Sequence, residues 1–212
     1  MNMTSDEIYR KRKRFFNEHA ERWYDMWYKD DSTGSYDKHS NGFERLFSLV
    51  PLKPGDRVLD VGCGTGVLVP FILERITSSG LLYELDFAEK MIDVNLAMHK
   101  GDNMRFIVAD AEQAPLSDGC CDAVICFSCF PHFQDKVRAV ANLYRILNTA
   151  GVFVVSHFDS SDGINRHHES CDAVMHDYLP DEAGMRSLLE TAGLHIDFFI
   201  DDPDFYCIRA GK

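Results

Sequence analysis

Three glycines alternate with other residues directly after a short apolar run. Gly62, Gly64 and Gly66 follow the run 58–61, in which Asp60 is the single polar residue. Glycine adopts positive φ without strain, and without a side chain it allows a ligand to lie against the main chain. The apolar segment that follows is typical of a helix, whose first N–H groups are free to bind a ligand. This strand, turn and helix predict a nucleotide-type site.

The spacing of the glycines narrows the choice of nucleotide. A dinucleotide-binding turn has the pattern G-x-G-x-x-G, whereas this turn has the pattern G-x-G-x-G and places Val67 where the last glycine would fall. The G-K-S/T ending of a phosphate-binding P-loop is also missing. The spacing therefore disfavours NAD, FAD and nucleoside triphosphates. An ordinary tight turn with no ligand stays open as an alternative.

A carboxylate follows the next predicted strand. Asp86 comes about 20 residues after the glycine turn, at the distance where an acid commonly accepts hydrogen bonds from ribose hydroxyls. The same residue could cap the helix that follows, and the two roles are compatible. Phe87, its neighbour, could lie against an adenine ring or belong to the core.

Two histidines follow later strands. His132 comes after the predicted strand 121–127 and His157 is near the end of the strand 151–158, so both should lie over the carboxyl-end crevice. Imidazole titrates near neutral pH and suits a general base or a group that orients a substrate. Each histidine could instead be ordinary polar surface.

The segment 160–180 could form a lid with chemistry of its own. In a helix, His168, Asp172 and His176 would lie on one face, where they could bind a metal or cover the substrate. Apolar residues would collect on the opposite face, which is also the pattern of an amphipathic helix with a solvated polar side. We expect no metal, and His168 is a third candidate near the acceptor.

Apolar periodicity predicts the scaffold that positions these residues. Helices around Trp23 and Phe43 precede a regular alternation of strands and helices, which predicts an α/β fold with a doubly wound, mostly parallel seven-stranded sheet. The last two strands should form an antiparallel pair at the sheet edge. The predicted strands are 57–61, 80–86, 104–109, 121–127, 151–158, 195–201 and 204–210, and the helices after the first two strands are 66–76 and 88–99.

The motifs resemble those of a known family. Residues 58–66 are similar to motif I of the class I S-adenosylmethionine-dependent methyltransferases, and the pair Asp110 and Ala111 resembles the family's Asp-Ala pair. The similarity extends from residue 58 to about residue 158. It is strongest to the branch that includes ubiquinone and menaquinone C-methyltransferases. The resemblance implies S-adenosylmethionine as cofactor and a Rossmann-like methyltransferase fold.

The resemblance also assigns parts of the cofactor to residues. It implies that Asp110 accepts a hydrogen bond from the adenine amine and that the methionine part lies at the glycine turn, including Cys63, beside Asp60. Phe127, at the end of the fourth strand, should border the methionine end and the reacting methyl group. The protein then has to align donor and acceptor and, for a protonated acceptor, remove a proton.

Composition sets the class of protein. A chain of 212 residues with 45% apolar content fits one domain. We expect an N-terminal helical lid at 1–50, a cofactor-binding core at 51–159, the lid insertion at 160–180, and a last helix with the edge strand pair at 181–212. The charge of −12 argues against a nucleic-acid partner, although residues 10–14 form one basic run. An RNA-binding arm or a solvated helix face would both explain that run.

The cysteines and the termini predict the compartment. Seven cysteines, an odd number, together with a charged N-terminus and no long apolar run, predict a cytoplasmic protein with no membrane span. Cys126 and Cys129 form a C-x-x-C, but positions three apart on a strand point to opposite faces. A dithiol pair would therefore need a turn within that spacing.

Several functions remain open from the sequence. The predicted reaction is methyl transfer to a small-molecule acceptor, with His132 or His157 near the acceptor. Alternatives on the same fold are aminopropyl transfer and a cofactor-binding subunit that serves a partner. A nicotinamide oxidoreductase is disfavoured by Val67. The sequence leaves a homodimer open.

Overall fold

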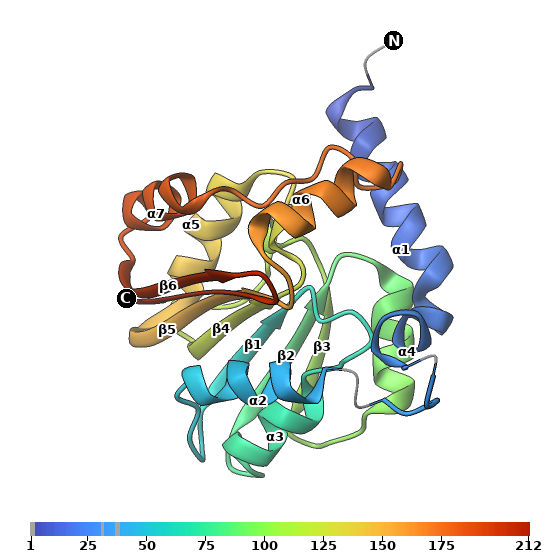
Figure 1. Cartoon of the computed structure of the whole chain (residues 1–212). Helices are drawn as coiled ribbons and strands as arrows, with labels where there is room; N and C mark the ends of the chain where they lie inside the picture. Colours follow the sequence, from blue (N-terminus) through green and yellow to red (C-terminus); the bar gives the residue numbers. More distant parts are fainter. Residues whose placement is uncertain (1–2, 31, 37–38) are drawn as a thin grey trace.

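The computed structural model describes residues 3–30, 32–36 and 39–212. These residues form one seven-stranded sheet with helices on both faces (Figure 1). The strands are β1 Arg57–Val61, β2 Leu81–Asp86, β3 Met104–Val108, β4 Cys121–Phe127, β5 Leu147–His157, β6 His195–Asp202 and β7 Phe205–Gly211. The helices are α1 Ser5–Tyr28, α2 Ser40–Leu49, α3 Val69–Ile76, α4 Glu89–Met98, α5 Lys136–Ile146, α6 Ser161–Ser170 and α7 Glu182–Thr191.

The sheet has the predicted doubly wound topology. Its strand order is β3-β2-β1-β4-β5-β7-β6, and β7 runs antiparallel to both of its neighbours. The other neighbouring strands pair in parallel. The order reverses between β1 and β4, and the carboxyl ends of these two strands mark the switch point where ligands bind in such sheets.

Two cores cover the two faces of the sheet. Along β1, Val58 packs with residues of α2 and α3, whereas Leu59 and Val61 pack with residues of α5 and α7. This alternation follows from the period of two along a strand. Because both faces are covered, β1 is buried along nearly its whole length, which is why it is apolar except at Asp60.

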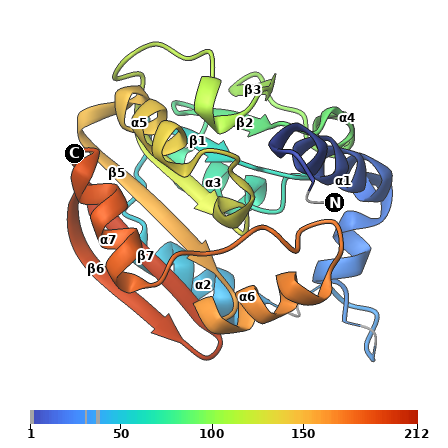
Figure 2. The ribbon, with the colours of Figure 1, turned by 90° about the horizontal axis from the view of Figure 1, so that it is seen from above.

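A third group of residues covers the carboxyl ends of the strands. Helix α1 packs on α4 through Phe16, Ala20 and Met91, and the chain after α6 adds Val174 to the same cluster. Figure 2 shows α1 and α6 over the strand ends, beside the loop that returns from α6. These three segments, α1, α6 and residues 171–179, form the roof of the site.

Most boundaries differ from the sequence prediction by at most three residues, and two differ by four or more. Strand β5 begins at Leu147, which pairs with Cys121 before the register shifts. Helix α6 ends at Ser170, so the predicted stripe of His168, Asp172 and His176 on one helix is wrong. Met175 and Tyr178, which a continuous helix would place on its apolar face, are exposed for the same reason.

Candidate active site

A cavity of about 420 Å³ lies at the carboxyl ends of the strands, under the roof. Its volume is in the range of pockets that enclose a small ligand. All but one of the predicted site residues line it, and the exception is Gly66. The lining residues that were predicted are Asp60, Gly62, Cys63, Gly64, Asp86, Phe87, Asp110, Ala111, Phe127, His132, His157 and His168.

The glycine turn is shaped by packing as well as by the cavity. Gly62, Gly64 and Gly66 all have positive φ. A Cβ on Gly62 would lie 2.4 Å from the Cβ of Cys129, and one on Gly66 would lie 2.4 Å from the Oδ1 atom of Asn95. Gly64 is the glycine whose added Cβ would meet only a roof residue of the cavity, with Trp23 Nε1 3.7 Å away. The turn therefore needs glycine at 62 and 66 for close approach of the protein to itself.

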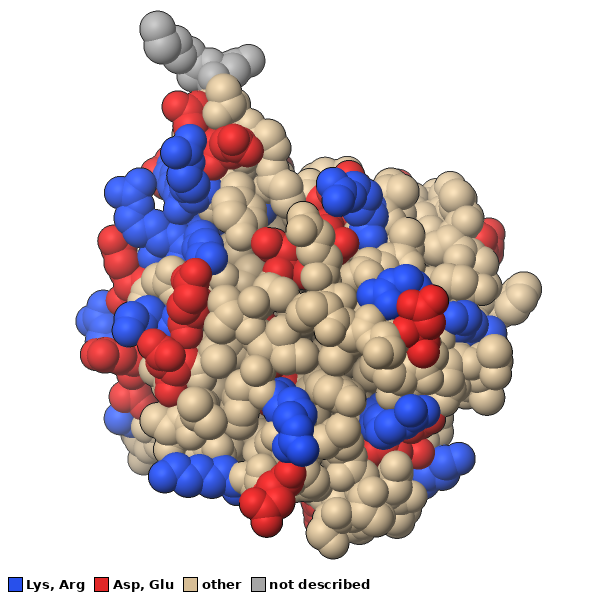
Figure 3. All heavy atoms as spheres, turned by 180° about the vertical axis from the view of Figure 1, so that it is seen from behind, with Lys and Arg blue, Asp and Glu red and all other residues tan. Residues whose placement is uncertain are grey.

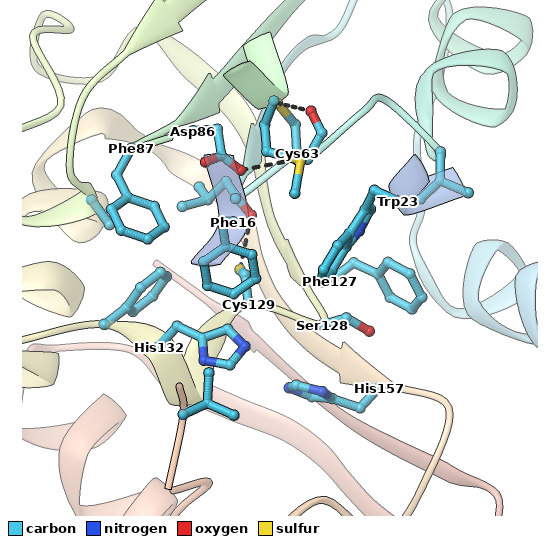
Figure 4. Close-up of a pocket in the computed structure, with 18 of the residues that line it drawn as sticks. Phe16, Trp23, Cys63, Asp86, Phe87, Phe127, Ser128, Cys129, His132 and His157 are labelled. Atoms are coloured by element: carbon cyan, nitrogen blue, oxygen red, sulfur yellow. Dashed lines mark hydrogen bonds between the residues drawn. The ribbon is translucent and has the colours of Figure 1, made fainter. Parts of the chain in front are cut away.

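Asp86 connects the glycine turn to helix α4. Its carboxylate accepts a hydrogen bond from the backbone N–H group of Gly64, at 3.0 Å (Figure 4). It accepts a second from the N–H group of Ala88, at 2.8 Å. Burial raises the pKa of Asp86 to about 6, although these N–H groups act in the opposite direction. The residue fixes the turn and borders the cavity at the same time.

Two further acids lie beneath the turn. Asp60 is buried, its Oδ2 atom has no hydrogen-bond partner among the described residues, and burial together with the nearby charge of Glu84 raises its pKa well above the usual value. Glu84 is fully buried and accepts a hydrogen bond from Asn95 at 2.6 Å. Burial raises the pKa of Glu84 to about 7. The sequence reasoning missed Glu84, because an acid inside a strand resembles a solvent-facing residue.

The charges around the cavity favour a cation. Among the described residues that line it there are five acids and no Lys or Arg: the acids are Asp60, Asp86, Asp110, Glu112 and Asp159. An unpartnered buried carboxylate oxygen on Asp60 would be stabilised by a positive group nearby. S-Adenosylmethionine carries a sulfonium and an ammonium group, so the residues present fit its methionine end.

Aromatic rings close the end of the cavity near Asp110. Tyr9 of α1 donates a hydrogen bond to Asp110 Oδ2 at 3.0 Å, and its ring contacts Phe87 with centroids 5.8 Å apart. Phe16 contacts the same ring at 5.7 Å. Such a slot suits a planar base. Tyr9 was missed because it is about 100 residues from Asp110 in the chain.

Three histidines gather at the other end of the cavity. Figure 4 shows His132 and His157 on the same side of the site, beyond the Phe16 ring. The rings of His132 and His168 are 5.0 Å apart. Burial lowers the pKa of His157 to about 3 and that of His168 to about 4, and the neighbouring histidines add to both shifts. His157 Nε2 has no hydrogen-bond partner among the described residues.

A buried acid that the sequence did not reveal lies behind these histidines. Asp177 accepts a hydrogen bond from His132 Nδ1 at 2.7 Å and another from Arg12 Nε at 2.8 Å. Arg12 and Asp177 are both buried and also form an ion pair. Arg12 donates to the backbone oxygen of His132 as well, at 2.8 Å. Neither residue has a local sequence signal, because they are 165 positions apart.

The basic run on α1 is largely neutralised by acids. Lys11 pairs with Asp172 and Lys13 pairs with Glu89, both at 2.6 Å. Figure 3 shows basic side chains interspersed with acidic ones along one edge of the molecule. This arrangement differs from the uninterrupted basic surface that binds a nucleic-acid backbone.

The C-x-x-C residues do not form a disulfide. All seven cysteines are free. The chain turns at Ser128, which has φ 53°, so Cys129 leaves the strand and its thiol donates to the Val61 carbonyl at 2.9 Å. Cys129 thereby packs against Gly62 and supports the glycine turn.

Neither a metal site nor a membrane span is found in the described part of the chain. No group of three or more His, Cys, Asp or Glu residues is arranged to hold a metal ion within residues 3–30, 32–36 and 39–212. Asp172 is exposed and paired with Lys11, so it does not share a helix face with His168 as predicted. No helix in those ranges combines the length and the apolar character that crossing a bilayer requires.

Known proteins share both the sequence motifs and the fold. Residues 59–155 match a family model described as a methyltransferase domain. A demethylmenaquinone methyltransferase from Thermus thermophilus is 35% identical over 116 residues, which cover 54% of this chain and 52% of the relative. A malonyl-[acyl-carrier protein] O-methyltransferase from Marinomonas sp. is 30% identical over 132 residues, 60% of this chain and 48% of the relative. The chain thus spans about half the length of these relatives.

A solved structure of an S-adenosylmethionine-dependent methyltransferase from Aquifex aeolicus superposes with a TM-score of 0.71 at 16% identity, covering 92% of this chain and 97% of that one. This likeness shows the fold. The motif match and the fold agree with each other and with the sequence prediction. Residues 59–155 carry a methyltransferase domain, and they lie within the fold of the class I S-adenosylmethionine-dependent methyltransferases.

Proposed function

We propose that this protein transfers a methyl group from S-adenosylmethionine to a small-molecule acceptor. The observation that carries the proposal is the cavity under the roof, which has acids at the glycine turn, an aromatic slot at Asp110, and histidines at the opposite end. Both relatives described above are methyltransferases by name. The bound cofactor would supply a methyl group already activated by its positive sulfur.

The residues of the chain would bind and align the two reactants. Asp60 and the N–H groups of the glycine turn would receive the methionine part, Asp86 the ribose, and Asp110 the adenine amine. Ala111, Phe87 and Phe127 would border these groups. Adenine binding requires Tyr9 to give up or share its hydrogen bond to Asp110, which makes α1 sensitive to the cofactor.

The roof would exclude water from the transferred methyl group. Residues 1–50 and 160–180 are proposed as lid segments around a core at 51–159, with residues 181–212 completing the sheet edge. Trp23, Trp27 and Ile164 line the cavity from the roof, and Trp27 contacts His167 with ring centroids 5.7 Å apart. Closure of two such segments would hold donor and acceptor in line.

The acceptor is expected to be uncharged or a hydrogen-bond donor, and not an anion. The cavity has no Lys or Arg among its described lining residues, so a carboxylate or phosphate would enter it without a counter-charge. Neutral imidazoles at His132, His157 and His168 can accept hydrogen bonds from a hydroxyl or amine.

Calorimetric titration with S-adenosylmethionine and S-adenosylhomocysteine tests the cofactor site. We expect micromolar binding of both that is lost in Asp86→Ala. Asp93→Ala is the matched control, since Asp93 is an exposed acid on α4 that pairs with the exposed Lys90. If neither ligand binds the natural protein, the proposal fails.

Transfer is then tested with a radiolabelled methyl donor and a panel of phenols, amines and carboxylic acids. Label in a phenol or amine supports the proposed acceptor class. Tight cofactor binding with no labelled product from any compound of the panel would favour a non-methylating use of the domain. Mass analysis of products would identify aminopropyl transfer.

A further inference from the structure

Asp177 contacts two of the histidines that line the cavity, through different atoms. Its carboxylate accepts a hydrogen bond from His132 Nδ1 at 2.7 Å, and its backbone carbonyl lies 3.0 Å from His168 Nδ1. Asp177 is itself 4% exposed and is not among the residues that line the cavity. It therefore acts on that site through the two imidazoles.

The chemistry of these contacts fixes the tautomers. A backbone carbonyl can only accept, so His168 Nδ1 must carry the proton. Burial acts to raise the pKa of Asp177, but His132 and Arg12 hold it below the usual value, so its carboxylate is ionised and also accepts only. Both neutral rings are thus protonated at Nδ1 and have a lone pair at Nε2. His132 Nε2 has no partner among the described residues, and the ring lines the cavity.

We propose that Asp177 is the positioning residue of this site, because it holds His132 and His168 with their Nε2 lone pairs available to the acceptor, and that its ion pair with Arg12 makes this arrangement depend on closure of α1. The proposal deepens the proposed methyl transfer and rests on it for its purpose. Arg12 is on α1 and Asp177 is on the segment 171–179, so this ion pair joins two of the three segments of the roof.

When the acceptor is a hydroxyl, this arrangement provides a base that can take up the hydroxyl proton. The acceptor oxygen forms a bond to the methyl carbon while the carbon–sulfur bond breaks, and the sulfur becomes a neutral thioether. The hydroxyl proton passes to Nε2 of His132. The resulting imidazolium lies against the Asp177 carboxylate, which stabilises its charge through the hydrogen bond from Nδ1.

The charged groups around His132 determine the direction in which its pKa is shifted. Asp177, Arg12, Lys136, His157 and His168 are the titratable and charged groups that face or electrostatically influence it. Burial lowers the pKa of His132, Asp177 opposes this, and Arg12 and Lys136 add to the lowering. Loss of Arg12 and loss of the Asp177 charge should therefore move the titration of His132 in opposite directions.

Long-range proton–nitrogen NMR of the full chain labelled with ¹⁵N-histidine tests the proposal. S-Adenosylhomocysteine is added to fill the cofactor site, and His132→Gln and His168→Gln assign the two signals. In the natural protein we expect both rings to show a protonated Nδ1 and an unprotonated Nε2 at neutral pH. In Arg12→Gln the His132 midpoint should rise by about 1 pH unit, because a positive neighbour is removed.

Two variants make the result specific. Asp177→Asn should lower the His132 midpoint and weaken its Nδ1 hydrogen bond, while His168 keeps its tautomer because the residue 177 carbonyl remains. Lys11→Gln removes an equal charge from the neighbouring position of the same helix and breaks the exposed pair with Asp172, and it should leave both histidines unchanged.

The possible outcomes separate this proposal from the proposed function. A wild-type His132 protonated at Nε2, or a His132 midpoint that moves equally in Arg12→Gln and Lys11→Gln, would overturn the role of Asp177 even if methyl transfer is found. If Asp177→Asn fails to fold, the comparison of Arg12→Gln with Lys11→Gln still decides. Failure of S-adenosylhomocysteine to bind would instead remove the proposed function.

Discussion

Glu84 and Asp86 are two residues apart on β2 and are both buried beneath or beside the glycine turn. Burial disfavours the charged form of a carboxyl group, so both have raised pKa values. Without a cation in the cavity, these acids oppose one another and Asp60. A positively charged ligand in the cavity would relieve that repulsion.

Glu84→Gln should change how stability depends on pH. The pKa of Glu84 is raised to about 7 in the folded protein from a usual value of 4.5, so the native state binds this proton more tightly than the unfolded state does. Its contribution is therefore fully present below pH 4.5 and is lost as pH rises through 7. At about 1.4 kcal/mol per pH unit the loss is at most about 3 kcal/mol.

Urea unfolding at several pH values between 4.5 and 8 checks this prediction. The free energy of unfolding of the natural protein should fall across that range relative to Glu84→Gln, which keeps a hydrogen-bond acceptor for Asn95. Parallel curves for the two proteins would show that Glu84 does not titrate in this range.

Gly66→Ala should destabilise the fold without touching the cavity. Gly66 has φ +87°, and an added Cβ would lie 2.4 Å from Asn95 Oδ1 and 2.8 Å from His99 Cδ2. Strain at positive φ and overpacking together should lower the free energy of unfolding by about 2–4 kcal/mol. Gly55→Ala is the control, because φ is +92° there but the nearest atom is 3.9 Å away, and it should cost only about 1 kcal/mol.

At the scale of elements, the sheet could be predicted and part of the roof could not. Apolar residues repeat every two positions in a strand and every 3.6 positions in a helix, and this spacing can be read from neighbouring residues. It placed the strand ends at Asp86 and Phe127 correctly. The cavity lining followed, because parallel strands end at one edge. Glu84 was missed because a buried acid inside a strand carries no local signal.

The wrong prediction for α6 has a physical cause outside the helix. Asn165 exchanges two hydrogen bonds with the backbone of Leu179, and His168 contacts the Asp177 carbonyl. These contacts between positions 9–14 apart favour a chain that turns back after Ser170 over one that continues the helix. The spacing of apolar residues in a helix does not reveal contacts with residues further along the chain. For the same reason, the pairing of Arg12 with Asp177 could not be predicted.

The roof elements should become more protected together when the cofactor binds. Hydrogen exchange measured by mass spectrometry should slow by at least about 10-fold in both α1 and α6 on saturation with S-adenosylmethionine, since closed roof segments and bound ligand stabilise one another. Slowing in α1 alone would mean that the two segments move independently.

At the scale of the whole molecule, basic side chains of α1 are paired with nearby acidic ones. The formal charge is −12, yet the basic run of α1 is matched by acids on α4 and on the return segment. These exposed pairs are individually weak, whereas the Arg12–Asp177 pair is buried and is costly to break. A buried ion pair thus joins α1 to the other segments of the roof.

That contact also sets an order of assembly during synthesis. Helix α1 leaves the ribosome first, but its partner Asp177 is 165 residues further along the chain. At about 5–20 residues per second, α1 waits on the order of ten seconds or more for the residue that neutralises Arg12. Meanwhile the strands that form the floor of the cavity, β1 to β5, can already pair. The floor of the cavity can thus form before Asp177 emerges, and His132 and His168 gain their contacts with Asp177 only when most of the protein has been translated.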